Sequence, residues 1–272
     1  MNWQADSNWT GLESWARHSP LPLRIAVLAA HPDDETIGAS VLLARSQRAS
    51  VIFLSDGAPR DSRLWPRTIQ GSREEYASIR REEAQNALRR VGISQGQIRW
   101  LGAIDQETIF AVSELATRLI EALREIRPQV IVTHPYEGGH PDHDCAALIA
   151  SIAVPRLGTG ARVLEMSSYH ARDRKLVTGE FLGGNAAQEM VVELSADERA
   201  RKRSMFDEYA TQQEVLKAFR TDRERFRAAP NYDFRQPPHE GRLWYQCLGW
   251  EMTGEHWREL AAAALEREFT CL

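Results

Sequence analysis

A cluster of ionisable residues, HPDDE at residues 31–35, directly follows the apolar run at residues 24–30. A short, nearly continuous apolar run is typical of a strand that is buried on both faces. A helix cap would explain one of the aspartates, but neither the neighbouring histidine nor three carboxylates in a row. The N-terminus of the following helix should help to keep Asp34 and Glu35 ionised. Because ligands of open α/β sheets bind at the carboxyl ends of the strands, this cluster is a candidate site.

A second cluster, GGHPDHD at residues 138–144, follows the apolar run at residues 129–133 in the same way. Pro141 suits the first turn of a helix, and His140 and His143, three positions apart, can face the same side of that helix. If both apolar runs are strands of one sheet, the two clusters meet at the same edge of that sheet.

Together the two clusters could supply a catalytic metal site. Catalytic zinc takes three protein ligands drawn from residues such as His, Asp and Glu, and leaves a position for water. We expect His31, Asp34 and His143 to be these ligands. Zn²⁺ is the expected metal, and other divalent metals could take the same ligands. Because zinc lowers the pKa of its water to about 7, Asp33 could act as general base, with His140 as acid or oxyanion partner.

Residues near the clusters have less specific interpretations. Asp142 or Asp144 could orient one of the histidines from outside the ligand set. His134 could do the same or belong to the core, and Cys145 is interpreted as an inert buried thiol turned away from the site. Trp65 follows a strand-end loop and could form a platform for a sugar. The set as a whole is suited to metal-assisted hydrolysis of an amide or ester.

The elements that must position these residues alternate along the first 155 residues. Strands are predicted at residues 24–30, 50–54, 97–101, 129–133 and 161–168, and helices after residue 35 and at residues 72–90, 108–126 and 142–154. This alternation indicates an α/β, Rossmann-like, mainly parallel sheet with helices on both faces.

The pattern changes after about residue 170. Residues 195–227 are charged and predicted to be helical, and residues 228–242, with three prolines, are predicted to be a loop that could border a substrate pocket. Because the expected ligands leave two strands of one sheet, we predict a single domain over residues 1–272. Its core would span about residues 22–170, and about residues 171–272 would form a C-terminal helical and loop elaboration.

Composition restricts the classes of partner. The 272 residues include 34 Lys and Arg against 38 Asp and Glu, a formal net charge of −4, so no basic face for nucleic acid is predicted. The apolar runs fall far short of the roughly 20 residues that cross a bilayer, and no secretory pattern precedes them. The three cysteines are widely spaced and form no disulfide framework. We expect a cytoplasmic protein with no membrane span, and the sequence leaves a homo-oligomer open.

The paired clusters resemble those of the PIG-L/LmbE-like family of zinc-dependent N-deacetylases. The resemblance rests on AHPDDE at residues 30–35 and GHPDH at residues 139–143, and extends over about residues 22–215. Members of this family remove the acetyl group from N-acetylglucosamine-type amino sugars. The resemblance implies an LmbE-like fold, together with the zinc ligands, the general base and the acid or oxyanion partner named above.

Smaller similarities to the family concern the substrate side of the site. Arg80 and Asp105 match positions that contact the sugar in some members. Residues 202–212 are similar to a later family segment, with Tyr209 at the place of its histidine. Gly138 stands where some members carry a mobile tyrosine, so that role has no counterpart at this position.

We therefore predict a hydrolase, a zinc-dependent N-deacetylase that removes an N-acetyl or N-acyl group from a small-molecule amino sugar or glycoconjugate. One alternative is a non-haem Fe(II) enzyme, which uses the same two-histidine, one-carboxylate site. The adjacent Asp33 favours hydrolysis over that alternative. A second alternative is a non-catalytic sugar-binding relative, although all five inferred residues are present. Dinucleotide binding is disfavoured because HPDDE stands where a G-x-G-x-x-G turn is needed.

Overall fold

The apolar runs of the N-terminal half form the parallel centre of one sheet in the computed structural model, which describes residues 20–183 and 189–270. The strands are β1 (Leu21–Ala29), β2 (Ser46–Ser55), β3 (Ile98–Ala103), β4 (Val130–Thr133), β5 (Arg162–Met166), β6 (Tyr169–Arg172), β7 (Lys175–Thr178), β8 (Glu189–Glu193) and β9 (Arg223–Ala228). The helices are α2 (Asp34–Arg45), α3 (Arg73–Arg89), α4 (Val112–Ile126), α5 (Pro141–Ala153), α6 (Ala196–Phe206), α7 (Gln213–Leu216), α8 (Trp244–Cys247) and α9 (Gly254–Thr270).

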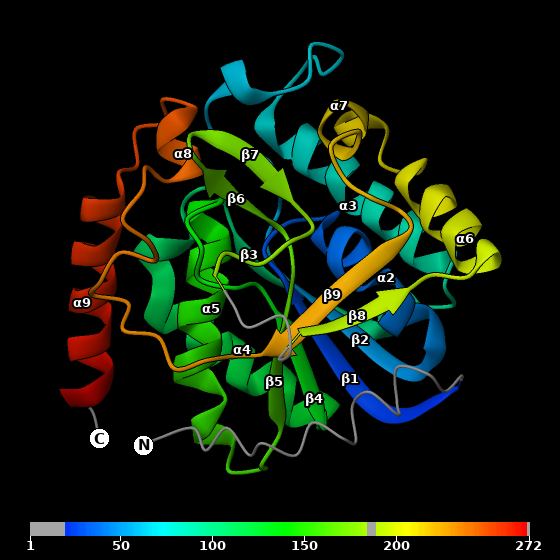
Figure 1. Cartoon of the computed structure of the whole chain (residues 1–272), viewed down its shortest axis with the longest axis horizontal. Helices are drawn as coiled ribbons and strands as arrows, with labels where there is room; N and C mark the ends of the chain where they lie inside the picture. The colour runs from blue at the N-terminus through cyan, green and yellow to red at the C-terminus, as the bar shows by residue number, and fades with distance from the viewer. Residues whose placement is uncertain (1–19, 184–188, 271–272) are drawn as a thin grey trace.

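The order of the strands places β1 beside β4 at the middle of the sheet. Within the described residues the order is β3-β2-β1-β4-β5-β9-β8, with parallel pairing from β3 to β5 and antiparallel pairing of β9 and β8 (Figure 1). From β1 the chain first builds one side of the sheet and then returns to build the other from β4. A crevice forms outside the carboxyl ends of the strands at such a switch point. The predicted α/β, mainly parallel fold is confirmed.

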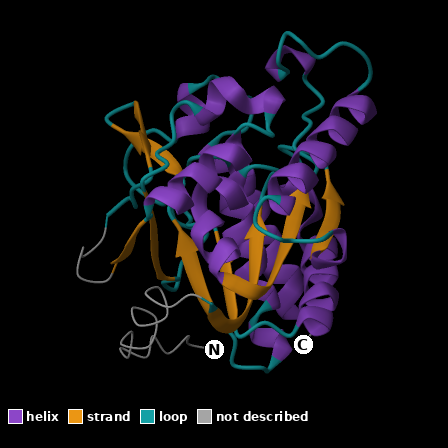
Figure 2. Ribbon diagram, turned by 90° about the vertical axis from the view of Figure 1, so that its right-hand side faces the viewer, coloured by secondary structure: helices purple, strands orange, loops and turns teal. Residues whose placement is uncertain are grey.

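Helices cover both faces of the sheet (Figures 1 and 2). α2, α3 and α6 contribute to one apolar cluster with side chains such as Ile25 and Val27. α4, α5 and α9 contribute to a second cluster, which includes Ala26 and Leu28. Because successive side chains of a strand point to opposite faces, β1 must be apolar at consecutive positions, and this explains its uninterrupted run.

The C-terminal part differs from the prediction in one respect and adds elements that the sequence did not reveal. The helical prediction for residues 195–227 is correct for α6 and α7 but wrong at its end, where β9 begins at Arg223. β8 and the β6–β7 hairpin were not predicted. Residues 229–243, which include most of the predicted loop, form neither helix nor strand. Residues 1–19, which we included in the domain, lie outside the described residues.

The lengths and compositions of the helices bear on the membrane prediction. Among the described residues, none of the helices combines the length and the apolar character that crossing a bilayer requires.

Candidate active site

The two clusters meet where β1 and β4 end side by side. Asp34 lies at the start of α2 and His143 in the first turn of α5. The Asp34 carboxylate lies between two rings, with Oδ1 3.2 Å from His143 Nε2 and Oδ2 3.2 Å from His31 Nδ1. Each of these three residues offers a ligand atom within 4.8 Å of the others, so they could hold a metal ion. The structure thus brings together the three ligands expected from the sequence.

The protonation states of His143 and Asp34 suit metal binding, whereas His31 would have to release a proton to bind a metal. Burial lowers the pKa of His143 to about 4. Burial alone would raise the pKa of Asp34, but His143 and His134 hold it well below its usual value. The pKa of His31 lies well above its usual value because the surrounding carboxylates, with Asp105 first, outweigh the effect of burial. A neutral histidine and an ionised carboxylate are ready ligands, and the carboxylates around His31 favour a cation at this place.

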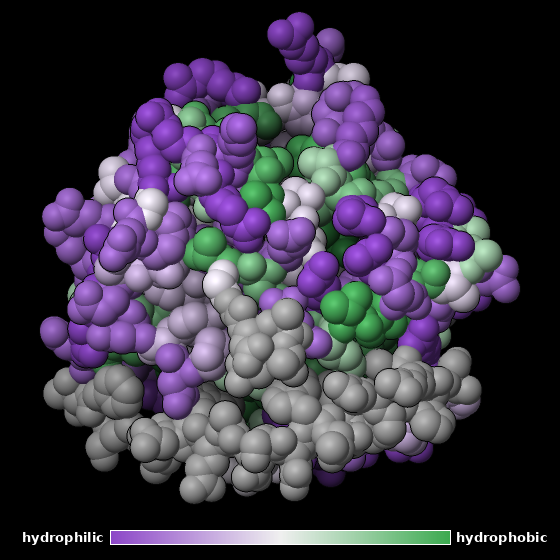
Figure 3. All heavy atoms as spheres, in the orientation of Figure 1, coloured by the Kyte–Doolittle hydropathy of each residue, from purple (hydrophilic) through white to green (hydrophobic). Residues whose placement is uncertain are grey.

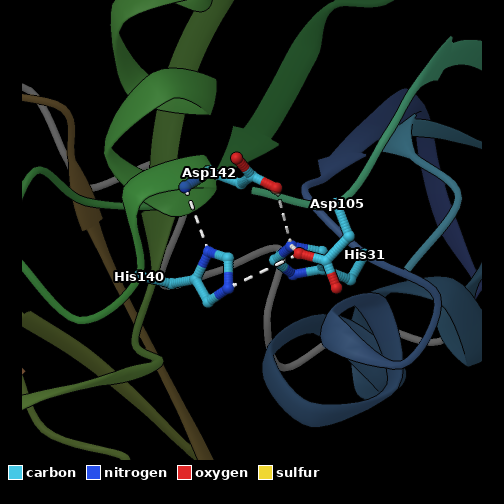
Figure 4. A group of neighbouring side chains, drawn as sticks. All are labelled: His31, Asp105, His140 and Asp142. Atoms are coloured by element: carbon cyan, nitrogen blue, oxygen red, sulfur yellow. Dashed lines mark hydrogen bonds and ion pairs between the residues drawn. The ribbon is translucent and has the colours of Figure 1, made fainter. Parts of the chain in front are cut away.

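The other nitrogen of His31 faces two further carboxylates. His31 Nε2 lies 3.1 Å from Asp142 Oδ2 and 3.1 Å from Asp105 Oδ1. Figure 4 shows both carboxylates pointing toward the His31 ring, with His140 on the α5 side of the group. Asp142 is itself held by the Gln106 amide at 2.7 Å and the Thr108 hydroxyl at 2.6 Å. Asp142 can therefore orient His31 in the way that carboxylates outside the ligand set orient metal-binding histidines.

His140 belongs to an overlapping group. With His31, Asp105 and Asp142 it makes up a second set of potential metal ligands. His140 Nδ1 accepts a hydrogen bond from the Asp142 amide at 3.0 Å, and its Nε2 lies 3.6 Å from Asp105 Oδ1. The pKa of His140 lies well below its usual value because of burial and the charge of His31. The neutral ring therefore carries its proton on Nε2, toward Asp105.

Asp33 lies beside the ligands and is paired with Arg80. Asp33 Oδ2 is 3.2 Å from Arg80 Nη2, and the same nitrogen donates a hydrogen bond to the Pro32 carbonyl at 2.5 Å. Burial raises the pKa of Asp33 to about 7, although Arg80 opposes this shift. A carboxylate with a pKa near neutrality is well matched to general-base work. Its backbone adopts φ 128°, a value that is strained for a residue other than glycine and often marks functional sites.

Comparison with known proteins identifies the part of the chain that carries this site. Residues 26–154 match the family model described as PIG-L, GlcNAc-PI de-N-acetylase. They form a PIG-L family domain. The family resemblance of the sequence is thereby confirmed for this range, which contains His31, Asp34 and His143.

Similar proteins include both deacetylases and an enzyme of another class. A mycothiol S-conjugate amidase of Streptomyces coelicolor is 32% identical over 154 residues, which cover 48% of this chain and 51% of the amidase. The chain thus spans about half the length of that relative. The crystal structure of the A40926 pseudoaglycone deacetylase matches with a TM-score of 0.58 and 19% identity over 76% of this chain and 96% of that one. The 4-carboxy-2-hydroxymuconate hydratase of Pseudomonas putida KT2440 matches with a TM-score of 0.53 and 15% identity, over 78% and 98%. These two structures share the fold, and the fold alone does not decide the chemistry.

A glycine pair shapes the loop between β4 and α5 in the PIG-L domain. A Cβ atom on Gly139 would lie 2.0 Å from the Tyr169 carbonyl oxygen, so only glycine lets β6 approach the residue before His140. Asp144 Oδ1 accepts hydrogen bonds from the amides of Glu137 at 3.1 Å and Gly138 at 2.9 Å. Asp144 therefore holds the loop through backbone amides, whereas Asp142 contacts His31.

The sequence contains only weak indications that His134 and Asp105 belong to the site. His134 Nε2 accepts the Ala30 amide at 3.1 Å and lies 3.4 Å from Asp34, and its ring stacks on His143 with centroids 3.9 Å apart. Its position directly after an apolar strand was the available signal. Asp105 had been noted through the family resemblance alone. No motif indicated that the loop after β3 brings it to His31.

The ionisation of the Glu35 carboxyl differs from our expectation. Its Oε1 accepts the Tyr209 hydroxyl at 2.6 Å and the Thr36 hydroxyl at 2.5 Å, and burial raises its pKa above the usual value. The helix N-terminus therefore does not ensure that Glu35 is ionised, as we had expected. Tyr209, at the histidine place of the family segment, reaches the first cluster from the C-terminal part.

A cavity of about 870 Å³ opens above this group of residues. Its floor includes His31, Asp33, Asp34, Arg80, Asp105, His140 and His143. Its walls also come from outside the PIG-L domain, including β6, β7, α7 and the segment around α8. Trp65 lines it, as its interpretation as a platform requires.

Cys145 is fully buried, and burial raises its pKa. Residues 229–235 of the predicted loop line a different cavity, of about 730 Å³, beside α5.

Proposed function

We propose that the protein is a metal-dependent hydrolase that removes an N-acetyl or N-acyl group from an amino sugar or glycoconjugate. The observation that carries this proposal is the convergence of His31, Asp34 and His143 beside Asp33, at the switch point of the sheet. The family match over residues 26–154 and the amidase relative support the same reaction class.

His31, Asp34 and His143 would hold the metal, which we infer to be Zn²⁺. The donor set fits this ion, because zinc accepts imidazole and carboxylate ligands and catalytic sites supply three of them. Zn²⁺ when bound supplies a Lewis acid that polarises a carbonyl oxygen and lowers the pKa of water.

The chain supplies the proton transfers and the hydrogen bonds. Asp33 accepts a proton from the water that attacks the acyl carbonyl, and Arg80 holds Asp33 in place. His140 carries its proton on Nε2 and is neutral, so it donates a hydrogen bond to the oxygen on which negative charge develops. Collapse of this state breaks the C–N bond. The proton that Asp33 accepted is then available for the leaving amine.

Two other chemistries are compatible with parts of this site. An Fe(II) enzyme would use the same three ligands, and one fold neighbour is a 4-carboxy-2-hydroxymuconate hydratase. Asp33 and its raised pKa favour hydrolysis over oxygen activation, which does not require a base beside the ligands, and the amidase relative favours amide cleavage over hydration. A non-catalytic sugar-binding protein would not need this base either.

The test is acetate release from a panel of N-acetylglucosamine conjugates, chitobiose and acylated glycopeptides. Protein purified without chelators should release acetate and a free amine from at least one of them. Chelation should abolish the reaction and added Zn²⁺ should restore it. A requirement for iron and O₂, or release of acetate that is indifferent to chelation, would overturn the proposal. Failure of the metal-loaded protein on every member of the panel would also count against it.

A further inference from the structure

The backbone of Asp33, the base of the proposed mechanism, is held in a strained conformation. Its φ of 128° is rare for a residue other than glycine, and such a conformation persists only where the surroundings stabilise it. The Asp33 amide donates a hydrogen bond to Glu35 Oε2 at 3.0 Å. The Asp33 carbonyl accepts the amides of Thr36 and Ile37, both at 2.9 Å, as α2 begins. The Glu35 carboxyl therefore fixes the amide side of the base.

The Glu35 carboxyl is itself held by Tyr209, which lies outside the PIG-L domain. Glu35 Oε1 accepts the Tyr209 hydroxyl at 2.6 Å and the Thr36 hydroxyl at 2.5 Å. Glu35 and Tyr209 are both fully buried, so these hydrogen bonds are shielded from solvent. Hydrogen bonds in a low-dielectric interior are strong, and they hold their groups rigidly when all partners are present. One carboxyl thus connects the Tyr209 hydroxyl with the amide of the base.

Tyr209 lies in the turn after α6, and the packing of that helix determines its position. Figure 3 shows mainly hydrophilic surface where α6 lies in Figure 1, whereas Met205 and Phe206 of this helix are buried in an apolar cluster. The Tyr209 amide donates to the Phe206 carbonyl at 3.1 Å, and the Tyr209 carbonyl accepts the Gln212 amide at 3.0 Å. Backbone hydrogen bonds on both sides therefore fix the place from which the hydroxyl reaches Glu35.

A second contact of the same segment concerns the carboxylate of the base. Thr211 donates to Glu83 of α3 twice, through its amide at 2.7 Å and through its hydroxyl at 2.6 Å. Glu83 Oε2 lies 4.0 Å from Nη1 of Arg80 on the same helix, and Arg80 in turn pairs with the Asp33 carboxylate. Residues 209–211 thus contact both the residue that holds the Asp33 amide and the helix that carries the partner of its carboxylate.

We propose that Tyr209, acting through Glu35, is a positioning residue for the general base, so that the C-terminal part of the chain contributes to the rate of the reaction in the PIG-L domain. This inference rests on the proposed deacetylase function, which assigns Asp33 the role of base. Asp33 lines the cavity above the candidate metal ligands, whereas Glu35 and Tyr209 do not. Loss of their contact should therefore lower kcat and leave substrate binding, and with it KM, in place.

The kinetic test compares two tyrosine variants, each of which removes one hydroxyl from a buried carboxyl. Tyr232 is the matched control, because it donates to Glu165 at 2.6 Å, the distance of the Tyr209–Glu35 contact, and lines the other cavity. A misplacement of about 1 Å can cost about 100-fold in rate. We expect Tyr209→Phe to lower kcat at least tenfold at unchanged metal content, with KM within about twofold, and Tyr232→Phe to change neither. Equal kcat values in the two variants would overturn the proposal.

Substitutions of Glu35 separate positioning from packing. The Asp33 amide can only donate a hydrogen bond, whereas the hydroxyls of Tyr209 and Thr36 can donate or accept one. Glu35→Gln can therefore serve all three groups, with its oxygen on the amide and its NH₂ group on the hydroxyls. Glu35→Leu can serve none of them. At equal metal content, kcat of Glu35→Gln should exceed that of Glu35→Leu at least tenfold. Equal values would show that Glu35 only fills space.

Hydrogen exchange at the Asp33 amide, followed by NMR, measures the same contact without hydrolysis. Without the Tyr209 hydroxyl, Glu35 should release this amide more often, so the amide should exchange at least tenfold faster in Tyr209→Phe than in Tyr232→Phe. The amides of β1 serve as the internal reference. If the Asp33 amide exchanges faster and no conjugate is hydrolysed, the deacetylase function fails and the link from Tyr209 to Asp33 stands. If hydrolysis occurs and either kcat or the exchange rate is equal in the two variants, the positioning role fails alone.

Discussion

At the level of single residues, the charges of buried neighbours set the pKa values that determine the chemistry of this site. Asp33 and Asp34 are adjacent and buried, yet the pKa of Asp34 is lowered by its histidines and that of Asp33 is raised to about 7. In the proposed mechanism, the two neighbouring carboxylates therefore have different tasks, Asp34 as a metal ligand and Asp33 as a base. Sequence alone could suggest both tasks, because the order of the residues after the strand is itself the motif.

The pH dependence of the reaction should reveal the coupling between Arg80 and Asp33. The Arg80 cation lowers the pKa of Asp33, so Arg80→Met should raise that pKa further above about 7. Since the base must be ionised, the acidic limb of the profile of kcat/KM should move to higher pH, by about one pH unit or more. Arg80→Lys keeps the cation and should shift the limb less. A limb that stays in place in Arg80→Met would show that Arg80 does not act on Asp33.

The residues that sequence could not place are those whose position depends on loops. His31, Asp34 and His143 each lie within a few positions of an apolar strand, so their meeting follows from the sheet. Asp105 reaches His31 only because the turn after β3 bends over the edge of the sheet. His134 is drawn to Asp34 by the hydrogen bond from the Ala30 amide. The contact of Asp105 has no local sequence signal, and the signal for His134 was its position directly after an apolar strand.

Strands could be predicted from the sequence where both of their faces are buried. β4 and the C-terminal halves of β1 and β2 are buried on both faces, and these parts contain the apolar runs seen in the sequence. β9 escaped prediction because it reads RERFRA, with Glu224 and Phe226 buried between arginines. The alternation typical of a strand was present, but its buried glutamate made the segment look like part of a charged helix. Glu224 is buried because it has a partner, and the sequence does not show partners.

That partner is Lys202 of α6. The ion pair also contacts α2, the helix that begins at Asp34. Lys202 Nζ lies 2.7 Å from Glu224 Oε1 and donates to the Ile37 carbonyl at 2.6 Å. Glu224 Oε2 accepts the Val41 amide at 3.1 Å. Ile37 and Val41 are four positions apart, so the ion pair contacts the carbonyl and amide that a regular helix joins to each other. The pair thus links α2 to α6 and β9.

Breaking this ion pair should lower the free energy of unfolding. Removing both charges together should lower it by less than the sum of the losses in the two single variants. Lys202→Met leaves the Glu224 charge buried alone, which should lower the free energy of unfolding by about 3–5 kcal/mol. The double variant Lys202→Met/Glu224→Gln removes that uncompensated charge. Urea unfolding of the two single variants and the double variant measures the coupling. Strictly additive losses would contradict the assignment of a buried ion pair.

For the whole molecule, the C-terminal part completes both the sheet and the cavity. β9 and β8 extend the sheet beside β5, and α9 packs into the same apolar cluster as α4 and α5. The segments around α7 and α8 form cavity walls that the PIG-L domain does not supply. The predicted boundary near residue 170 therefore marks a change in sequence pattern, whereas the packing continues across it.

This packing predicts that the chain unfolds as one unit. Unfolding curves in urea followed by far-ultraviolet circular dichroism and by tryptophan fluorescence should coincide, because neither part has a core of its own. Two separated transitions would contradict a single domain and would instead assign the C-terminal part an independent core.

In the proposed function, metal ligands and a separate base cooperate in amide hydrolysis, and Asp33→Asn separates the two contributions. The measurement is the rate of acetate release by the variant and the unaltered protein at equal metal content, on the best substrate of the panel. The variant should keep its metal and lose about 10²–10⁴-fold in rate. An unchanged rate at equal metal content would contradict this mechanism.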